Sequence, residues 1–253
     1  MLVKQKAKYI QTLGQKKFRE QEGVFIAEGP KLVKELLETN AAAIKEIYGV
    51  KDWIVENEKL LAKKEVTEVT EAELEKISQL TTPNKVLAIV RQFDNDEDID
   101  VRGKITLVLD GIQDPGNMGT IIRIADWFGI EQIVCSNDSA DIYNPKVVQA
   151  TMGSIARVRV LYTDLEEWLT GQKDIRIYAS VLEGQDVTGM KKLNEGIIII
   201  GNESRGISET VLNLANVKIT IPRKARPDDP VGRGKAESLN AAVAAGIVLG
   251  YVV

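Results

Sequence analysis

Short β-rich runs alternate with helical patterns along most of the chain, and this alternation constrains the fold more than any other feature of the sequence. A first set of β-rich runs comprises GVFIAEG, IKEIYGV, KEVTEVT and VLAIVRQ, with helical patterns between them that include residues 51–62. A second set starts at ITLVLD and includes a strand pattern at 175–181 and a helix pattern at 207–215. Strands separated by helices are typical of a mostly parallel, buried sheet. The sequence therefore predicts an α/β fold.

One acidic segment separates the two sets of runs. DNDEDIDVRG, at residues 94–103, has few apolar side chains to bury and is typical of an interdomain linker. The predicted organisation is a small α/β sandwich at 1–95, an acidic linker at 96–103 and a larger α/β domain at 104–253. Two helix starts are marked locally, because Pro30 suits a first turn and Thr70 with Glu73 can form a capping box.

The absence of histidine narrows the possible chemistry. The 253 residues contain no histidine and a single cysteine, Cys135, which lies in an apolar run. This composition excludes Ser-His-Asp and Cys-His nucleophile systems and disfavours a metal site. No run approaches the roughly 18 to 20 apolar residues that a membrane helix needs, so we expect a cytoplasmic protein without a membrane anchor.

Positive charge is concentrated at the N-terminus although the formal net charge of the chain is −4. The first nineteen residues carry no acidic side chain and six basic ones, namely Lys4, Lys6, Lys8, Lys16, Lys17 and Arg19. A local basic face can bind nucleic acid phosphates by releasing counterions. A solvated basic helix would have the same composition, and both interpretations remain open.

The first segment that could carry chemistry is LDGIQDPGNMGTIIRIADWFG, in which a strand end leads through a polar turn into a helix. Asn117 is a suitable N-cap for this helix. A buried stripe is expected from the apolar residues Ile121, Ile124, Ala125 and Phe128. At helical spacing, Arg123 points about 150° away from that stripe. Arg123 is therefore either a solvent-facing arginine or a residue that serves a site outside its own core.

Two further segments place polar turns after strands. EGIIIIGNESRGIS runs from a strand into a turn with Gly201, Glu203 and Gly206, and Ser208 then caps a helix. Ligands of open α/β sheets bind at such strand ends, although the dinucleotide fingerprint G-x-G-x-x-G is missing here. The third segment runs from the strand VKITIP through a polar loop to a C-terminal helix of small residues, which begins near Ser238 and Asn240. Such a helix permits close packing within the fold or between subunits.

A long polar loop precedes that last helix. Its basic residues are Arg223, Lys224, Arg226, Arg233 and Lys235. They form either a phosphate contact region or a solvated surface.

Together, the three segments resemble the SpoU (TrmH-like) family of the SPOUT superfamily. The first family motif matches Asn117, Gly119 and Arg123, and the second matches Gly201, Glu203 and Gly206. The third matches Ile221 and Pro222, followed by Ser238, Leu239 and Asn240. The resemblance covers residues 105–253, and the preceding part looks like a substrate-binding domain with a small ribosomal-protein fold.

This resemblance implies an enzyme that transfers a methyl group from S-adenosylmethionine to a ribose 2'-hydroxyl of RNA, with ribosomal RNA favoured over transfer RNA. It also implies a deep trefoil knot, a homodimer formed through the knotted region, and no metal. Arg123 would stabilise the developing alkoxide, and the residues that would orient the reaction are Asn117, Glu203, Ser238 and Asn240. The residues that would hold the cofactor are Ser180, Val181, Gly201, Ile221 and Leu239.

The chain departs from the family pattern at two places. Arg223 replaces the usual methionine after Ile221 and Pro222, in a loop longer than is common, and Ala242 replaces a serine of the last motif. Alternative functions are a transfer RNA 2'-O-methyltransferase and a catalytically silent RNA-binding assembly factor with the same fold. A further alternative is an enzyme that binds a nucleotide or phosphorylated metabolite at the Gly201 turn.

Overall fold

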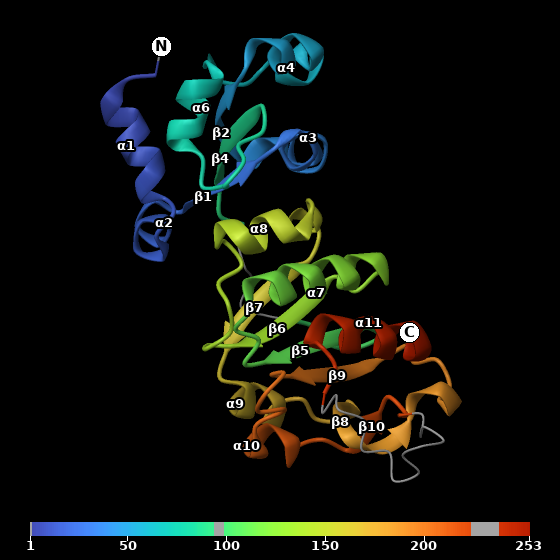
Figure 1. Ribbon diagram of the computed structural model, residues 1–253. Helices are drawn as coiled ribbons and strands as arrows, with labels where there is room; N and C mark the ends of the chain where they lie inside the picture. The colour runs from blue at the N-terminus through green and yellow to red at the C-terminus, as the bar shows by residue number, and fades with distance from the viewer. Residues whose placement is uncertain (1, 94–98, 224–237) are drawn as a thin grey trace, which may run out of the picture. The chain divides into compact units, whose positions relative to one another are not determined.

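The computed structural model describes residues 2–93, 99–223 and 238–253. The chain forms two compact units. The first comprises Met1–Asp94 and also takes in Asp141–Arg157 from later in the sequence, and the second comprises Asn95–Ala140 and Val158–Val253. Each unit contains its own sheet (Figure 1). None of the helices in the described ranges combines the length and the apolar character needed to span a bilayer.

The first unit is built on a four-stranded sheet with the order β1-β4-β2-β3. Its strands are β1 (Val24–Glu28), β2 (Ile44–Gly49), β3 (Val66–Glu68) and β4 (Val86–Arg91). β4 runs antiparallel to both β1 and β2, whereas β3 runs parallel to β2. The four strands coincide with the four runs expected from the sequence.

Helices cover both faces of this sheet. They are α1 (Lys4–Thr12), α2 (Lys16–Glu22), α3 (Pro30–Thr39), α4 (Lys51–Glu56), α5 (Glu58–Leu61), α6 (Glu71–Ile77) and α8 (Pro145–Thr151), with 3-10 turns at η1 (Ala41–Ala43) and η2 (Ser154–Ala156). α1 and α6 lie on one face and α3 lies on the other (Figure 1). Pro30 starts α3, and the Thr70–Glu73 capping box is formed, as the sequence predicts.

A buried arginine joins α2 to the segment that begins at Asp141. The Arg19 side chain is only 2% exposed and donates to the backbone oxygens of Leu13 and Gly14, at 3.0 and 2.8 Å. Its Nη2 also lies 2.6 Å from Asp141 Oδ2. Because a buried charge must be paired and hydrogen-bonded, this contact fixes the start of the later segment against the first unit, where α8 packs on β1.

The second unit contains a six-stranded sheet with the order β10-β8-β9-β5-β6-β7. Its strands are β5 (Ile105–Asp110), β6 (Gln132–Ser136), β7 (Arg159–Thr163), β8 (Ile177–Asp186), β9 (Gly196–Gly201) and β10 (Val217–Thr220). All neighbouring strands run parallel. Its helices are α7 (Pro115–Trp127), α9 (Leu165–Thr170), α10 (Glu209–Leu212) and α11 (Ala241–Val252), with a 3-10 turn at η3 (Val187–Gly189).

The central strands of this sheet are buried on both sides. Val108, Val134 and Ile199 share one core cluster with Leu165 and Leu169 of α9. Alternate residues on the same strands point the other way, toward the face covered by α7 and α11 (Figure 1). This double covering explains the almost uninterrupted apolar runs ITLVLD and GIIIIG. The predicted α/β class with a mostly parallel sheet is confirmed.

The helix of small residues, α11, packs on α7, and its glycines lie at ordinary contact distance from that helix. A Cβ at Gly246 would lie 3.5 Å from Ile124 Cδ1, and one at Gly250 would lie 3.7 Å from Phe128 Cζ. The smooth surface expected from the sequence is therefore used, at least in part, within the chain. The predicted trefoil knot depends on residues 224–237, which lie outside the described residues, and it stays a prediction.

Candidate active site

Strands β5 and β9 end side by side at the point where the winding of the large sheet reverses. From β5 the chain proceeds to β6 and β7 on one side, while β9, β8 and β10 lie on the other. Asp110, the last residue of β5, is in register with Gly201, the last residue of β9. Ligands of open parallel sheets bind outside the carboxyl ends of the strands at such a reversal. This edge is therefore where a site is expected on topology alone.

The turn after β5 is shaped by Asp114. Its carboxylate accepts a 2.8 Å hydrogen bond from the backbone nitrogen of Asn117, and the helix begins at Pro115. The expectation that Asn117 caps this helix is wrong, because the Asp-Pro pair starts the helix earlier. Asn117 instead lies in the first turn, where its side chain is free to reach across the sheet edge.

The turn after β9 approaches its own backbone very closely. A Cβ at Gly201 would lie 2.4 Å from the carbonyl carbon of Gly206. Asn202 organises the turn, because its Oδ1 accepts from the backbone nitrogens of Ser204 and Arg205, at 2.9 and 3.1 Å. Its Nδ2 donates to the backbone oxygen of Gly111 at 2.7 Å. Asn202 thus fastens the β9 turn to the β5 turn.

Four of the side chains singled out in the sequence meet at this edge. Asn117 Nδ2 donates to Glu203 Oε1, and Asn240 Nδ2 donates to Asn117 Oδ1 at 2.8 Å. Ser238 Oγ donates to the backbone oxygen of Glu203 at 3.2 Å. Asn240 also caps α11 by accepting from the backbone nitrogens of Ala242 and Val243. The hydrogen bonds therefore connect three turns that are far apart in the sequence.

Arg123 does not join this group. It lies on the exposed face of α7, and its guanidinium makes no hydrogen bond or ion pair within the described ranges. The buried stripe of α7 is formed by Met118, Gly119, Ile121, Ile122 and Ala125, so the expected stripe is right at Ile121 and Ala125, whereas Ile124 and Phe128 are only partly buried. Trp127, one turn after Arg123, is 85% exposed.

The positions expected to hold a cofactor lie at neighbouring strand ends. Pairing of β8 with β9 stops at Ala179, and pairing with β10 resumes only at Gln185. Ser180 and Val181 therefore lie in a break of the sheet register. Ser180, Val181, Gly201 and Ile221 are partly buried and Leu239 is 46% exposed. None of these five residues carries a charge.

Further polar residues of this edge were not singled out in the sequence, among them Asp110, Asp138 and Arg205. Asp110 Oδ2 accepts from the backbone nitrogen and the hydroxyl of Ser208, at 2.7 and 2.8 Å. Ser208 occupies the N-cap position of α10, but its hydroxyl bonds Asp110 instead of the helix, which corrects its expected capping role. Asp138 Oδ2 lies 3.3 Å from Arg205 Nη2. The hydrogen bond from Ser136 and the contact with Arg205 lower the pKa of Asp138 below its ordinary value. The position of Asp110 at the end of a predicted strand was the available signal for it.

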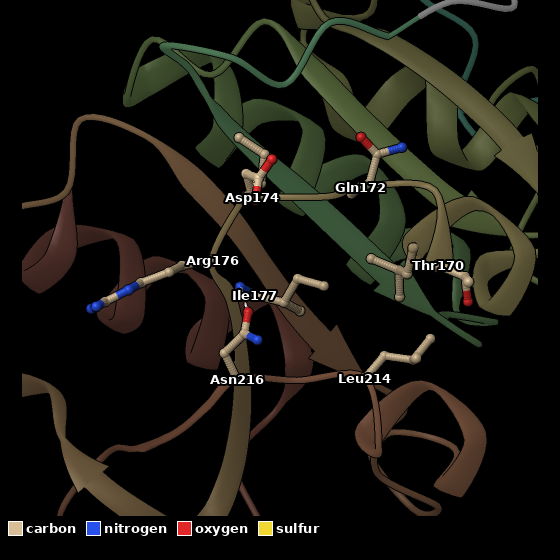
Figure 2. A pocket seen from close by; sticks show the side chains of 9 residues that line it. Thr170, Gln172, Asp174, Arg176, Ile177, Leu214 and Asn216 are labelled. Atoms are coloured by element: carbon tan, nitrogen blue, oxygen red, sulfur yellow. Dashed lines mark hydrogen bonds between the residues drawn. The ribbon is translucent and has the colours of Figure 1, made fainter.

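A cavity of about 480 Å³ lies at the opposite edge of the sheet and contains none of the expected site residues. Figure 2 shows it between Thr170, Arg176 and Asn216, where β8 and β10 begin. Asn216 Oδ1 accepts from the backbone nitrogen of Ile177 at 2.7 Å, so this amide completes the sheet. The amino ends of parallel strands are not where such folds place their ligands.

Two further expectations concern the basic loop before α11 and a metal site. The loop residues Lys224, Arg226, Arg233 and Lys235 lie outside the described residues, so their predicted phosphate contacts stay predictions. Within residues 2–93, 99–223 and 238–253, no three histidine, cysteine or carboxylate side chains are grouped as a metal site requires.

Comparison with protein families gives two matches. Residues 104–250 match the SpoU rRNA Methylase family, and residues 4–88 match an MRM3-like substrate binding domain. The two matches cover the two sets of strands recognised in the sequence.

Individual proteins match over nearly the full length. The 23S rRNA (guanosine(2553)-2'-O)-methyltransferase RlmP of Bacillus subtilis is 29% identical, over 97% of this chain and 94% of that protein. The crystal structure of an AdoMet-bound rRNA methyltransferase from Sinorhizobium meliloti superposes with a TM-score of 0.83, at 30% identity, and the match covers 98% of this chain and 94% of that chain.

Proposed function

Because this chain belongs to the SpoU rRNA methylase family, we propose that it transfers a methyl group from S-adenosylmethionine to a ribose 2'-hydroxyl of ribosomal RNA. It is an S-adenosylmethionine-dependent RNA 2'-O-methyltransferase: the Bacillus subtilis relative is named as a 2'-O-methyltransferase, and the Sinorhizobium meliloti structure contains bound AdoMet. The family assignment made from the three sequence motifs is confirmed. Ribosomal RNA is the substrate named for both of the relatives described above.

The observation that carries this function is the hydrogen-bonded connection of Asn117, Glu203 and Asn240 at the reversal point of the sheet. Each side chain comes from a different turn, so the fold has to bring them together. Directional hydrogen bonds between such side chains hold their polar groups in place before a substrate arrives. An edge of this kind suits a reaction that depends on orientation.

The residues proposed to hold the cofactor fit its chemistry. Backbone groups at Ser180, Val181 and Gly201 lie at adjacent strand ends, and Val181, Ile221 and Leu239 offer apolar contact to an adenine ring. When bound, S-adenosylmethionine supplies a sulfonium-activated methyl group. The small turn at Gly201 allows a ligand to approach the backbone closely.

The role proposed for Arg123 is electrostatic. Arginine stays protonated at neutral pH, so its guanidinium can stabilise the charge that develops on the ribose oxygen better than it can remove a proton. The 2'-oxygen would form a bond to the methyl carbon as the methyl–sulfur bond breaks, which leaves S-adenosylhomocysteine, and the proton of the hydroxyl would pass to solvent. Asn117, Glu203, Ser238 and Asn240 would orient the reacting groups.

The oligomeric state and the domain roles belong to the same proposal. Arg123 points away from its own core, so we propose a homodimer in which α7 and α11 meet the partner subunit and Arg123 serves the shared active site. Residues 1–95 would bind the RNA substrate, and residues 104–253 would form the knotted catalytic domain. A cytoplasmic location follows from the proposed substrates.

Methyl transfer from labelled S-adenosylmethionine to bulk RNA tests the function, and mapping 2'-O-methyl sites in RNA from cells with and without the gene identifies the nucleotide. Arg123→Ala is expected to reduce turnover by about 10²-fold or more, as for other groups that stabilise a developing oxyanion. Calorimetry should show affinity for S-adenosylhomocysteine within a few-fold of wild type. Turnover near wild type would overturn the role of Arg123.

The same assays separate the alternatives. A catalytically silent assembly factor would bind S-adenosylhomocysteine without transferring label. An enzyme acting on a phosphorylated metabolite would not bind it at all. Methylation found only in transfer RNA would replace the ribosomal substrate and leave the chemistry intact.

A further inference from the structure

Arg205 occupies a central position on the same edge, although none of the family motifs includes it. It follows Glu203 by two residues in the β9 turn. Its Nη2 lies 3.3 Å from Asp138 Oδ2, in the loop after β6. The same Nη2 would lie 3.3 Å from a Cβ at Gly111, so the guanidinium rests over the β5 turn. Arg205 therefore contacts the loops that follow β5 and β6.

The surroundings of Arg205 hold its guanidinium in place. Its backbone nitrogen donates to Asn202 Oδ1 at 3.1 Å, and Asn202 is itself bonded to Gly111. Ser136 Oγ donates to Asp138 Oδ1 at 2.7 Å and accepts from the backbone nitrogen of Gly111 at 2.8 Å. These hydrogen bonds orient the acceptor as well as the arginine. A cation oriented in advance loses less freedom when it binds a ligand.

The charge of the edge explains why a cation is needed there. Its carboxylates are those of Asp110, Asp114, Asp138 and Glu203. Asp110, Asp114 and Glu203 accept hydrogen bonds from uncharged donors. Of these four carboxylates, Asp138 is the one that forms an ion pair within the part of the chain that the structure describes. An RNA strand that brings its ribose to this edge also brings phosphates, which these carboxylates would repel.

The contact with Asp138 leaves Arg205 available. The two side chains are 64% and 52% exposed, and one Nη2 approaches one oxygen at 3.3 Å. Exposed ion pairs of this kind contribute little stability because water and salt screen them. A guanidinium has five N–H donors, so further donors can bind the two oxygens of a phosphate.

We propose that Arg205 binds a backbone phosphate of the RNA strand beside the ribose that is methylated. This inference rests on the proposed function and assigns a substrate contact at the same edge. Asp138 aims the guanidinium in the free protein and is not required once the phosphate is bound. Arg205 is thus a substrate-binding residue, and the turnover of bound substrate does not depend on it.

Four variants test this assignment, with RNA binding measured at several salt concentrations and methyl transfer measured over a range of RNA concentrations. Arg205→Ala should raise the Kd and KM for RNA about tenfold and reduce the salt slope by about one. Its kcat and its affinity for S-adenosylhomocysteine should stay within about twofold of wild type. Arg205→Lys keeps the charge but loses the planar guanidinium that can bind two phosphate oxygens at once. This variant should therefore retain the salt slope and bind RNA more weakly than wild type.

Asp138→Ala distinguishes a phosphate contact of Arg205 from an ion pair that only holds the turns together. Arg176→Ala is the matched control. Arg176 is an exposed arginine at the opposite edge of the same sheet (Figure 2), so its removal should change none of these quantities. Asp138→Ala should bind RNA within about threefold of wild type, because it removes an exposed pair of small energy.

Two results would overturn the assignment. One is an unchanged RNA affinity and salt slope in Arg205→Ala. The other is an Asp138→Ala variant that loses RNA affinity as strongly as Arg205→Ala. That result would mean that the ion pair stabilises the two turns and that Arg205 does not bind a phosphate. Either result can occur while the wild-type protein methylates RNA, so the proposed function would survive. Failure of the wild-type protein to methylate any RNA would overturn both.

Discussion

At Gly201 the last residue of β9 lies against the backbone of its own turn, without room for a side chain. A Cβ there would be 2.4 Å from the carbonyl carbon of Gly206 and 2.5 Å from the nitrogen of Ile207. Both neighbours are backbone atoms, which cannot rotate away as a side chain can. Because the same turn carries Glu203 and Arg205, any displacement would also move the residues that face the proposed substrates.

We predict that Gly201→Ala lowers the affinity for S-adenosylhomocysteine and the turnover by at least about tenfold, since a misplacement of about 1 Å can cost far more. Calorimetry and methyl transfer would measure the two effects. Gly246→Ala is the matched control, because its Cβ would meet Ile124 Cδ1 at an ordinary 3.5 Å. That substitution lies in a helix and should raise stability by up to about 1 kcal/mol. Equal cofactor affinity in the two variants would show that the Gly201 turn does not hold the cofactor.

Single residues of the edge were predictable to different degrees. Asn117, Glu203 and Asn240 were recognisable because each follows a strand or begins a helix, and parallel strands end at one edge. The capping role of Asn117 was wrong, because Asp114 and Pro115 supply a stronger start three residues earlier. The role of Arg205 was not recognisable, since it depends on contacts with Gly111 and Asp138, which are distant in the sequence.

Helices α1 and α2 show how a charge pattern acquires a structural role. The basic N-terminal segment is not a free arm, because Ile10 and Leu13 are fully buried in the core of the first unit. Deleting residues 1–19 would therefore remove part of that core along with the charge. Large-to-small changes at such positions each cost about 2 to 5 kcal/mol. A deletion would test stability more than it tests RNA binding.

A charge substitution tests the basic face without disturbing the core. Lys4, Lys8 and Lys17 are exposed, and replacing all three with alanine should weaken RNA binding and reduce the salt slope by up to about 0.9 per lysine that contacts a phosphate. The control variant replaces Lys51, Lys59 and Lys63, which are also exposed, and it changes the net charge by the same amount. Thermal unfolding should be similar for both variants. Equal salt slopes would mean that α1 and α2 are merely solvated.

Among whole elements, the strands and the longer helices were predictable from their apolar patterns. The helix expected at 51–62 is divided at Asn57 into α4 and α5, and the one expected at 207–215 shrinks to Glu209–Leu212. β8 extends to Asp186, well past the expected end at 181, because its second half pairs with β10 after a register break. Long-range pairing of this kind leaves no trace in a local pattern.

At the scale of the molecule, sequence spacing gave the fold class but could not give the order of the strands. The apolar runs of β5, β6 and β9 look alike, since each is buried on both faces. Which strand lies beside β5 is decided by packing of distant segments. The packing of α8 on β1 in the first unit has the same origin, because a helical pattern does not specify which sheet covers its apolar face.

An unpartnered surface on the second unit bears on the proposed dimer. α7 and α11 pack together, and their exposed large apolar side chains are Trp127, Val243 and Tyr251. Exposed apolar groups on adjacent helices are typical of an interface. Arg123 shares the outward face of α7 with Trp127, one turn apart. If the dimer forms there, Arg123 of one subunit would act on the Glu203 edge of the partner.

Subunit mixing tests that arrangement. Arg123→Ala and Glu203→Ala homodimers should each have lost most of their methyl transfer, because each lacks one component in both sites. After the two proteins are unfolded, mixed in equal amounts and refolded together, half of the dimers combine one variant of each kind. If Arg123 acts across the interface, one site of each mixed dimer is intact, and activity should recover to about a quarter of wild type.

The alternative predicts a different yield from the same mixture. If Arg123 acts within its own subunit, every site in a mixed dimer still carries one substitution, so mixing restores no activity. The control adds Trp127→Asp to both variants. A carboxylate buried at the interface should prevent dimerisation, so analytical ultracentrifugation should show monomers and mixing should restore no activity. Recovery that persists in monomeric protein would exclude a shared site, because two chains that do not associate cannot complete each other.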